Sequence, residues 1–122
     1  MAALTPDDEN YLNGHYSDQW EVPDNGSHLL IRGYHLPDGY DRKEVDMMVL
    51  IPAGYPAAAL DMFYFSPSIN RKDSASIRAV AQEEHFGCSW QRWSRHYQWQ
   101  PGVHCVATHF QYIENALLDE AK

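Results

Sequence analysis

Three short apolar runs, separated by proline and glycine, constrain the fold of this chain most strongly. The runs are His28–Leu36, Val45–Ile51 and Leu60–Phe65. The turn signals Pro37-Asp38-Gly39-Tyr40 and Pro52-Ala53-Gly54-Tyr55-Pro56 follow the first and the second run. Short connections of this kind join antiparallel neighbours, so the pattern predicts a meander of about three strands.

An amphipathic helix is predicted near the C-terminus by the most regular periodicity in the chain. Its apolar positions recur at helical spacing: Val103, Val106, Ala107, Phe110, Ile113 and Leu117. Pro101-Gly102 precedes this stripe as a break, so we expect the helix from Val103 to Leu118. The residues 68–86 before it are polar and irregular in pattern, although 74–84 also suit a short helix. Strands followed by a helix predict an α+β fold.

The 122 residues are enough for one ordinary domain. Residues 1–26 form a polar segment in which Thr5-Pro6 and the acids after it predict a short helix, ended by Asn13-Gly14. The loose acidic head of this segment is expected to be solvated or to meet a basic partner. We expect residues 27–122 to form the folded domain.

The net charge of -8 disfavours nucleic acid and anionic membranes as partners, because both attract basic surfaces. No apolar stretch approaches the ~18 residues that a membrane span needs. The N-terminus also lacks the basic and apolar regions of a signal peptide. Two cysteines do not make a disulfide scaffold. These observations predict a cytoplasmic protein with two free thiols and no membrane or nucleic-acid partner.

Cys88 is the strongest candidate for chemistry, within His85-Phe86-Gly87-Cys88-Ser89-Trp90. A nucleophilic thiol needs exposure and a group that helps it to ionise. A loop position would supply the first, and His85 or His96 would supply the second. The alternative is that Cys88 is a small buried apolar residue, as free cysteines often are.

Other constellations carry weaker signals. Cys105 is expected on the helix, away from its apolar stripe. His85, Cys88, Cys105 and His109 suggest zinc, but no CxxC or HExxH motif supports this reading. The ring-rich segment 90–96 predicts either a packed aromatic lid, with Arg92 or Arg95 stacked on a ring, or the wall of a reaction site. Ser94 and His96 would be the polar groups of that site.

The order of these features resembles the ubiquitin-conjugating (UBC) fold. In that fold a β-meander ends at a Tyr-Pro turn, a long irregular stretch carries the catalytic cysteine, and a Trp-x-Pro element leads into a helix. The matching segments here are Val49–Pro56, Leu60–Phe65, Ser66–Asn70, Cys88, Trp99–Pro101 and the predicted helix. Three further segments, LPDGY, IPAGYP and WQRWSRH, are similar to the prokaryotic UBC-related family E. That family is associated with bacterial operons encoding a ubiquitin-like protein, an activating enzyme and a JAMM-type metalloprotease, and with antiviral defence.

The resemblance implies a compact UBC-like fold and a conjugating enzyme without a metal or organic cofactor. Cys88 would accept a ubiquitin-like protein from an activating enzyme as a thioester and pass it to a target protein. A JAMM-type protease would be the deconjugating partner. Two alternatives stay open, a UBC-like binding module without catalysis and a small zinc protein.

The chain also departs from the family pattern. The usual His-Pro-Asn motif is replaced by Ser66-Pro67-Ser68-Ile69-Asn70, which lacks the histidine and displaces the asparagine. The oxyanion donors are therefore expected among Asn70, Ser89 and the backbone N–H groups near Gly87, and the base is expected to be His85 or His96. An oxyester on Ser94 is the alternative if Cys88 is incidental.

Overall fold

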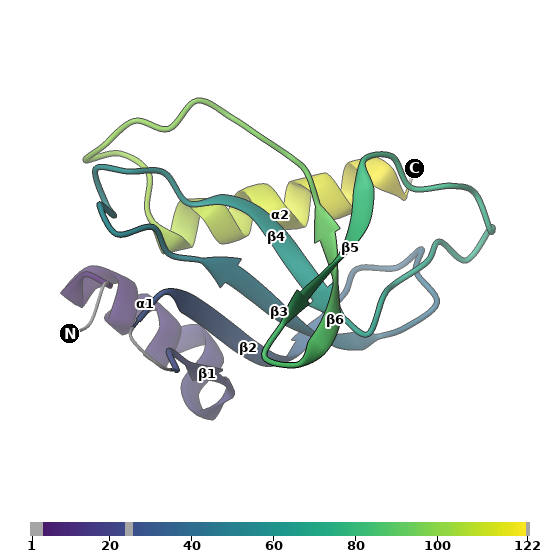
Figure 1. The fold of residues 1–122 in the computed structure, drawn as a ribbon, viewed down its shortest axis with the longest axis horizontal. Helices are drawn as coiled ribbons and strands as arrows, with labels where there is room; N and C mark the ends of the chain where they lie inside the picture. The colour runs from purple at the N-terminus through teal and green to yellow at the C-terminus, as the bar shows by residue number, and fades with distance from the viewer. Residues whose placement is uncertain (1–3, 24–25, 122) are drawn as a thin grey trace.

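An antiparallel sheet of six strands forms the centre of the computed structural model, in the order β1-β2-β3-β4-β6-β5 (Figure 1). The structure describes residues 4–23 and 26–121. The strands are β1 (Trp20–Glu21), β2 (His28–His35), β3 (Glu44–Leu50), β4 (Asp61–Ser66), β5 (Val80–His85) and β6 (Cys88–Trp93). The helices are α1 (Pro6–Tyr16), the short 3-10 helix η1 (Ser17–Gln19) and α2 (Val106–Glu120).

The predicted α+β fold class is confirmed, and so are the three apolar runs, which form β2, β3 and β4. The option of a helix over 74–84 is wrong, because residues 80–85 form a strand paired along its whole length with β6. Ala, Gln and Glu favour helices locally, but the pairing overrides this preference. The stretch around Cys88 is therefore a β-hairpin rather than an irregular segment.

The C-terminal helix is confirmed, but it begins at Val106, and Val103 lies outside it with 62% of its surface exposed. A turn closes residues 100–104, where the Gln100 carbonyl accepts the N–H groups of Val103 and His104. Pro101 and Gly102 thus end the preceding segment three residues before the helix starts. Among the described residues, no helix has the length and apolar character to span a membrane.

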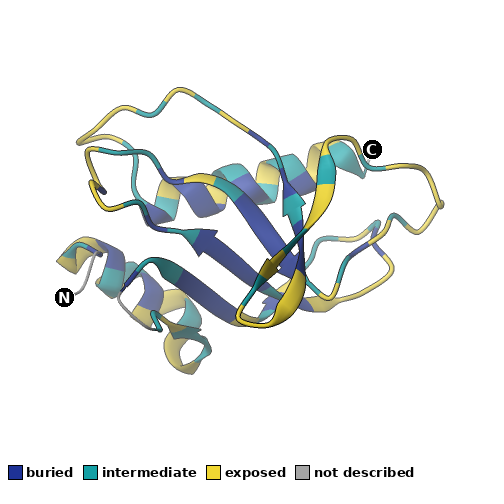
Figure 2. Ribbon diagram, viewed as in Figure 1, coloured by how far each residue is buried: buried dark blue, intermediate teal, exposed yellow. Residues whose placement is uncertain are grey.

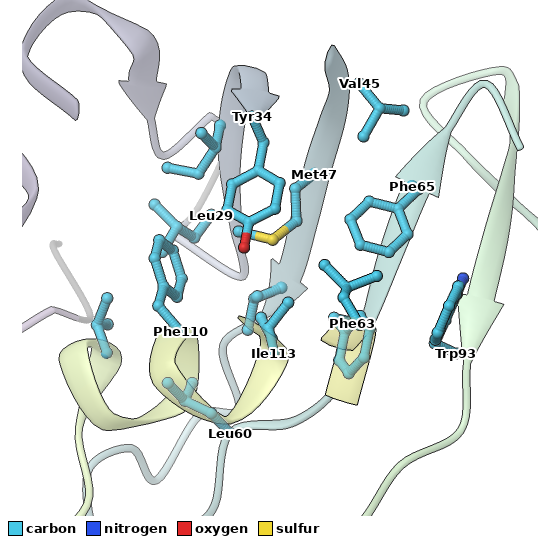
Figure 3. Close-up of a cluster of buried hydrophobic side chains, with 14 of the residues drawn as sticks. Leu29, Tyr34, Val45, Met47, Leu60, Phe63, Phe65, Trp93, Phe110 and Ile113 are labelled. Atoms are coloured by element: carbon cyan, nitrogen blue, oxygen red, sulfur yellow. The ribbon is translucent and has the colours of Figure 1, made fainter. Parts of the chain in front are cut away.

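Helix α2 covers one face of the sheet and completes the main core. Its buried stripe consists of Val106, Phe110, Ile113 and Leu117. Phe110 and Ile113 point toward sheet side chains that include Leu29, Met47 and Phe63 (Figure 3). The central strands are buried along most of their length, whereas β5 and the tip of its hairpin are exposed (Figure 2).

The β5–β6 hairpin crosses the opposite face of the sheet, away from α2 (Figure 1). Only residues 91–93 of β6 pair with β4. Trp90 instead packs on that outer face, in a second buried cluster with Leu30, Met48 and Tyr64. Trp90 and Trp93 therefore point to opposite sides of the sheet, because side chains alternate along a strand. They do not share a face as they would on a helical turn.

Within the segment 90–96, Arg95 stabilises the fold. Arg95 is buried and its guanidinium lies 4.8 Å from the centre of the Trp93 ring, as one of the sequence readings predicted. It also donates a hydrogen bond to Glu120 at the end of α2, at 3.1 Å. Burial lowers the pKa of Arg95, and the neighbouring Arg78 acts in the same direction. The pair with Glu120 offsets both and fixes the last turn of α2 against the sheet.

A buried carboxylate joins helix α1 to the rest of the fold. Asp8 is the third residue of α1 and forms a capping box with Thr5. It also accepts a hydrogen bond of 2.6 Å from the Tyr55 hydroxyl and one of 3.2 Å from the Val106 N–H. Burial and this hydrogen bond raise the pKa of Tyr55, so its hydroxyl remains a donor. Asp8 therefore caps α1 and α2 and anchors the turn between β3 and β4.

Candidate functional site

Cys88 lies at the tip of the β5–β6 hairpin, where its side chain is exposed. The two turn residues, Phe86 and Gly87, have φ values of 55° and 73°. Two residues with positive φ form the turn that best suits the twist of a hairpin. The register places Cys88 directly opposite His85. The sequence analysis thus predicted that this thiol is exposed, but it did not predict the hairpin that exposes it.

A carboxylate orients the histidine beside this thiol. The His85 Nε2 atom lies 2.7 Å from a Glu83 carboxylate oxygen. Glu83 also accepts hydrogen bonds of 2.9 Å from the Tyr64 hydroxyl and from the Arg92 guanidinium. The hydrogen bond from His85, followed by those from Tyr64 and Arg92, holds the pKa of Glu83 below its usual value.

The strand geometry places the three groups on one face. Side chains alternate along a strand, so Glu83 and His85 share a face of β5, and Cys88 faces the same side from β6. The register and the strand alternation thus bring a thiol, a histidine and the carboxylate bonded to that histidine to one face of the hairpin, and these are residue types that nucleophilic catalysis uses. Glu83 is a member of this site that the sequence analysis did not identify. The spacing of Glu83 from His85, two residues on one strand, could have pointed to it only once β5 was known.

An apolar pocket of about 420 Å³ opens beside the hairpin, on the outer face of the sheet. It is lined by Ser27, His28, Leu50, Ile51, Pro52, Ala59, Asp61, Met62 and His85. His85 is therefore common to the pocket and to the cross-strand pair with Cys88. The exposed Phe86 ring rests on His28 at the pocket rim, with the ring centres 4.6 Å apart.

Asp61 forms another part of the pocket wall and binds the candidate base His96. The His96 Nδ1 atom lies 2.9 Å from an Asp61 carboxylate oxygen, and both side chains are about half exposed. Asp61 was not a candidate from the sequence, because nothing in the segment Leu60–Phe65 set it apart from an ordinary strand end. The pocket thus lies between one histidine–carboxylate pair at His85 and another at His96.

The remaining candidates lie elsewhere or are already bonded. The Asn70 amide donates to Asp41 at 3.3 Å, and the Asn70 N–H donates to the same carboxylate at 3.0 Å. The Ser89 hydroxyl donates to Gln82 at 2.6 Å. Ser94 follows the last residue of β6, six residues from Cys88, which is up to about 20 Å of extended chain. The structure does not bring Ser94 and Cys88 into one site.

The four residues suggested for zinc lie on two sides of the sheet. His85 and Cys88 are on the outer hairpin, whereas Cys105 is the N-cap of α2 on the inner side. His109 is buried, with its ring nitrogens bonded to the Tyr97 hydroxyl at 2.6 Å and to the Met62 carbonyl at 3.0 Å. Within residues 4–23 and 26–121, no group of three or more His, Cys, Asp or Glu side chains is arranged to hold a metal ion.

The buried His109 predicts a loss of stability in mild acid. Burial lowers its pKa from 6.5 to about 4, so the folded protein keeps it neutral where the unfolded chain is protonated. The free energy of unfolding should therefore fall as the pH drops from 7 to 5, by about 2 kcal/mol from this residue. Urea unfolding at both pH values measures the change. His109→Gln should flatten the difference, and an equal slope in both proteins would contradict this assignment.

These features define a small α+β domain with an exposed thiol beside a pocket, consistent with a UBC-like fold. A family model described as prokaryotic E2 family E matches residues 4–120, nearly the whole chain. The chain belongs to this family, as the sequence motifs indicated, and is a ubiquitin-conjugating-like protein. No significant match was found among curated proteins or solved structures.

Proposed function

We propose that this protein is a conjugating enzyme in which Cys88 carries a ubiquitin-like protein as a thioester. The observation that carries the proposal is the placement of Cys88, an exposed thiol opposite the carboxylate-bound His85. Family membership supports the same role. The partners would be a ubiquitin-like modifier, its activating enzyme and a target protein in the cytoplasm. A JAMM-type protease would remove the modifier, in a system that serves antiviral defence.

The first step transfers the acyl group from one sulfur to another. The Cys88 thiolate attacks the C-terminal carbonyl carbon of the modifier, which the activating enzyme holds as a thioester. A new C–S bond forms, and the thiolate of the activating enzyme leaves. His85 accepts the Cys88 proton, because it lies opposite Cys88 on the neighbouring strand and Glu83 orients its ring.

The second step passes the modifier to the target. An amine of the target attacks the thioester carbonyl, Cys88 leaves as thiolate, and a base accepts the amine proton. His96, which Asp61 binds through Nδ1, is a candidate for that base. The backbone N–H groups around Gly87 are the remaining candidates for stabilising the oxyanion, since the side chains of Asn70 and Ser89 are bonded elsewhere. One such donor is worth about 2.7–4 kcal/mol of barrier.

The test is the intact mass of the protein after incubation with the activating enzyme, the ubiquitin-like protein and ATP. We expect an adduct equal to the modifier minus one water, which disappears when a reductant with a free thiol is added. The activating enzyme must be shown to carry the modifier in the same reaction. A charged activating enzyme with no adduct on this protein would contradict the proposal.

A binding module without catalysis is the second candidate, and the fate of Cys88 separates the two. In that reading Cys88 would be a buried residue, whereas the structure exposes it at a hairpin tip. A thiol reagent in the native state should therefore label Cys88 at least tenfold faster than the partly buried Cys105. Equal, slow labelling of both thiols would favour the binding module.

A further inference from the structure

We propose that Glu83 and Arg92 are positioning residues that keep the ring proton of His85 on Nε2, so that Nδ1 accepts the Cys88 proton. The inference rests on the proposed function, since it assumes that His85 takes this proton. It deepens that function by naming the reacting nitrogen and by giving Arg92 a part in the reaction.

The two oxygens of the Glu83 carboxylate have separate partners. Oε1 accepts a hydrogen bond of 2.9 Å from the Arg92 guanidinium. Oε2 accepts one of 2.9 Å from the Tyr64 hydroxyl and lies 2.7 Å from His85 Nε2. The Tyr64 ring also packs edge-on against the His85 ring, with the ring centres 5.2 Å apart. Contacts from β4 and β6 therefore hold both the carboxylate and the imidazole in place.

The charge of Glu83 decides which nitrogen of His85 carries the proton. The hydrogen bond from His85, with those from Tyr64 and Arg92, keeps the pKa of Glu83 below its usual value. An ionised carboxylate only accepts hydrogen bonds, so His85 donates from Nε2 and the neutral ring has its lone pair on Nδ1. Among the residues that the structure describes, Nδ1 has no hydrogen-bond partner. It is therefore available for the proton of the cross-strand partner Cys88.

Arg92 sets the direction of this network, because a guanidinium donates hydrogen bonds and accepts none. It occupies the Glu83 oxygen that His85 does not use. In this position Arg92 buries its Nε atom without a hydrogen-bond partner in the described part of the chain. A buried donor without an acceptor is unfavourable. The ion pair with Glu83 is the contact that accounts for this placement.

Glu83→Gln tests both residues, because an amide has one accepting oxygen and one donating nitrogen. Arg92 only donates, so it should hold the amide oxygen and turn the NH₂ group toward His85. Nε2 would then accept, and the ring proton would move to Nδ1. In Glu83→Gln combined with Arg92→Met the amide can turn back, since Tyr64 and His85 both donate to its oxygen. The ring proton should then return to Nε2.

Two measurements follow the proton and the reaction separately. Long-range ¹H–¹⁵N spectra at a pH of about 8 show which ring nitrogen is protonated, and His85→Gln assigns the signals. The second measurement is the acylation of Cys88 by the mercaptoethanesulfonate thioester of N-acetylglycine, followed by intact mass. In that step the Cys88 sulfur attacks the carbonyl carbon, a C–S bond forms, mercaptoethanesulfonate leaves as thiolate, and Nδ1 takes the Cys88 proton.

Glu83→Gln should place the proton on Nδ1 and slow the acylation at least tenfold. In serine proteases, the same exchange of carboxylate for amide keeps the geometry but gives the unreactive tautomer. The double variant should regain the Nε2 proton and most of the lost rate. Glu84→Gln is the matched control, because Glu84 is exposed on the other face of β5, and it should change neither measurement.

A proton on Nδ1 in the wild-type protein would overturn the inference. A reversed tautomer in Glu83→Gln with an unchanged rate would also overturn it, and a proton that stays on Nδ1 in the double variant would remove the role of Arg92. These results leave the thioester role of Cys88 intact, because that role is measured by the adduct formed with the charged activating enzyme. A wild-type protein that forms no such adduct would count against the proposed function itself.

Discussion

Replacing Cys88 with alanine should abolish the reductant-sensitive adduct completely, because no other exposed thiol exists among the described residues. Cys88→Ser should instead give a slower adduct that resists thiol reductants, since an oxyester is not exchanged by thiols. Intact mass after incubation with the activating enzyme, the modifier and ATP measures both changes. The expected loss for Cys88→Ala is at least 100-fold in the rate of adduct formation.

Two variants are matched controls for this result. Cys105→Ala removes the other thiol, at the N-cap of α2, and should retain the adduct. Ser94→Ala should also retain it, because Ser94 lies at the far end of β6 from Cys88. An undiminished adduct in Cys88→Ala would refute the assignment of the nucleophile. A reductant-resistant adduct lost in Ser94→Ala would move the chemistry to an oxyester on Ser94.

Asp8→Ala should lower the free energy of unfolding by about 2–6 kcal/mol, because it leaves two buried donors without an acceptor. The substitution leaves the Tyr55 hydroxyl and the Val106 N–H without the buried carboxylate that accepts both. Unpaired buried donors cost about 1–3 kcal/mol each. Urea unfolding followed by circular dichroism measures the change.

A neutral variant isolates the role of the charge at Asp8. Asp8→Asn keeps one acceptor oxygen of similar placement, so it should cost less than Asp8→Ala. Asp7→Ala is the control, because Asp7 lies in the same helical turn but is exposed. A loss below 1 kcal/mol for Asp8→Ala would show that the carboxylate does not hold the two helices together.

The elements with strong local signals were predictable from the sequence. Apolar runs bounded by proline and glycine marked β2, β3 and β4, and the stripe from Val106 to Leu117 marked α2. β5 could not be predicted, because its alternation is weak and its side chains favour helices. This segment is a strand because it pairs with β6 across the Phe86-Gly87 turn. Asparagine, aspartate or glycine usually stands at the first position of such a turn, so phenylalanine there gives no turn signal in the sequence.

The candidate site was predictable only in part. Cys88 and His85 are three residues apart in the sequence and are cross-strand partners in the structure. The sequence analysis did not identify Glu83 and Asp61. Each is part of the site only because the fold places its carboxylate beside a histidine, His85 for Glu83 and His96 for Asp61. The reading of Asn70 as an oxyanion donor relied on order along the chain, whereas the structure commits its amide to Asp41 in the loop after β2. Such hydrogen bonds are tertiary contacts, which no local sequence pattern predicts.

The carboxylate that caps α2 belongs to Asp8 of α1. This hydrogen bond couples the unfolding of α1 to the unfolding of the first turn of α2. If α1 detaches, the Val106 N–H loses its acceptor and the first turn of α2 frays with it. Hydrogen exchange at Val106 therefore reports the opening of a helix about 98 residues away in sequence. A protein that binds α1 would therefore change the hydrogen-exchange protection of Val106 without contacting α2.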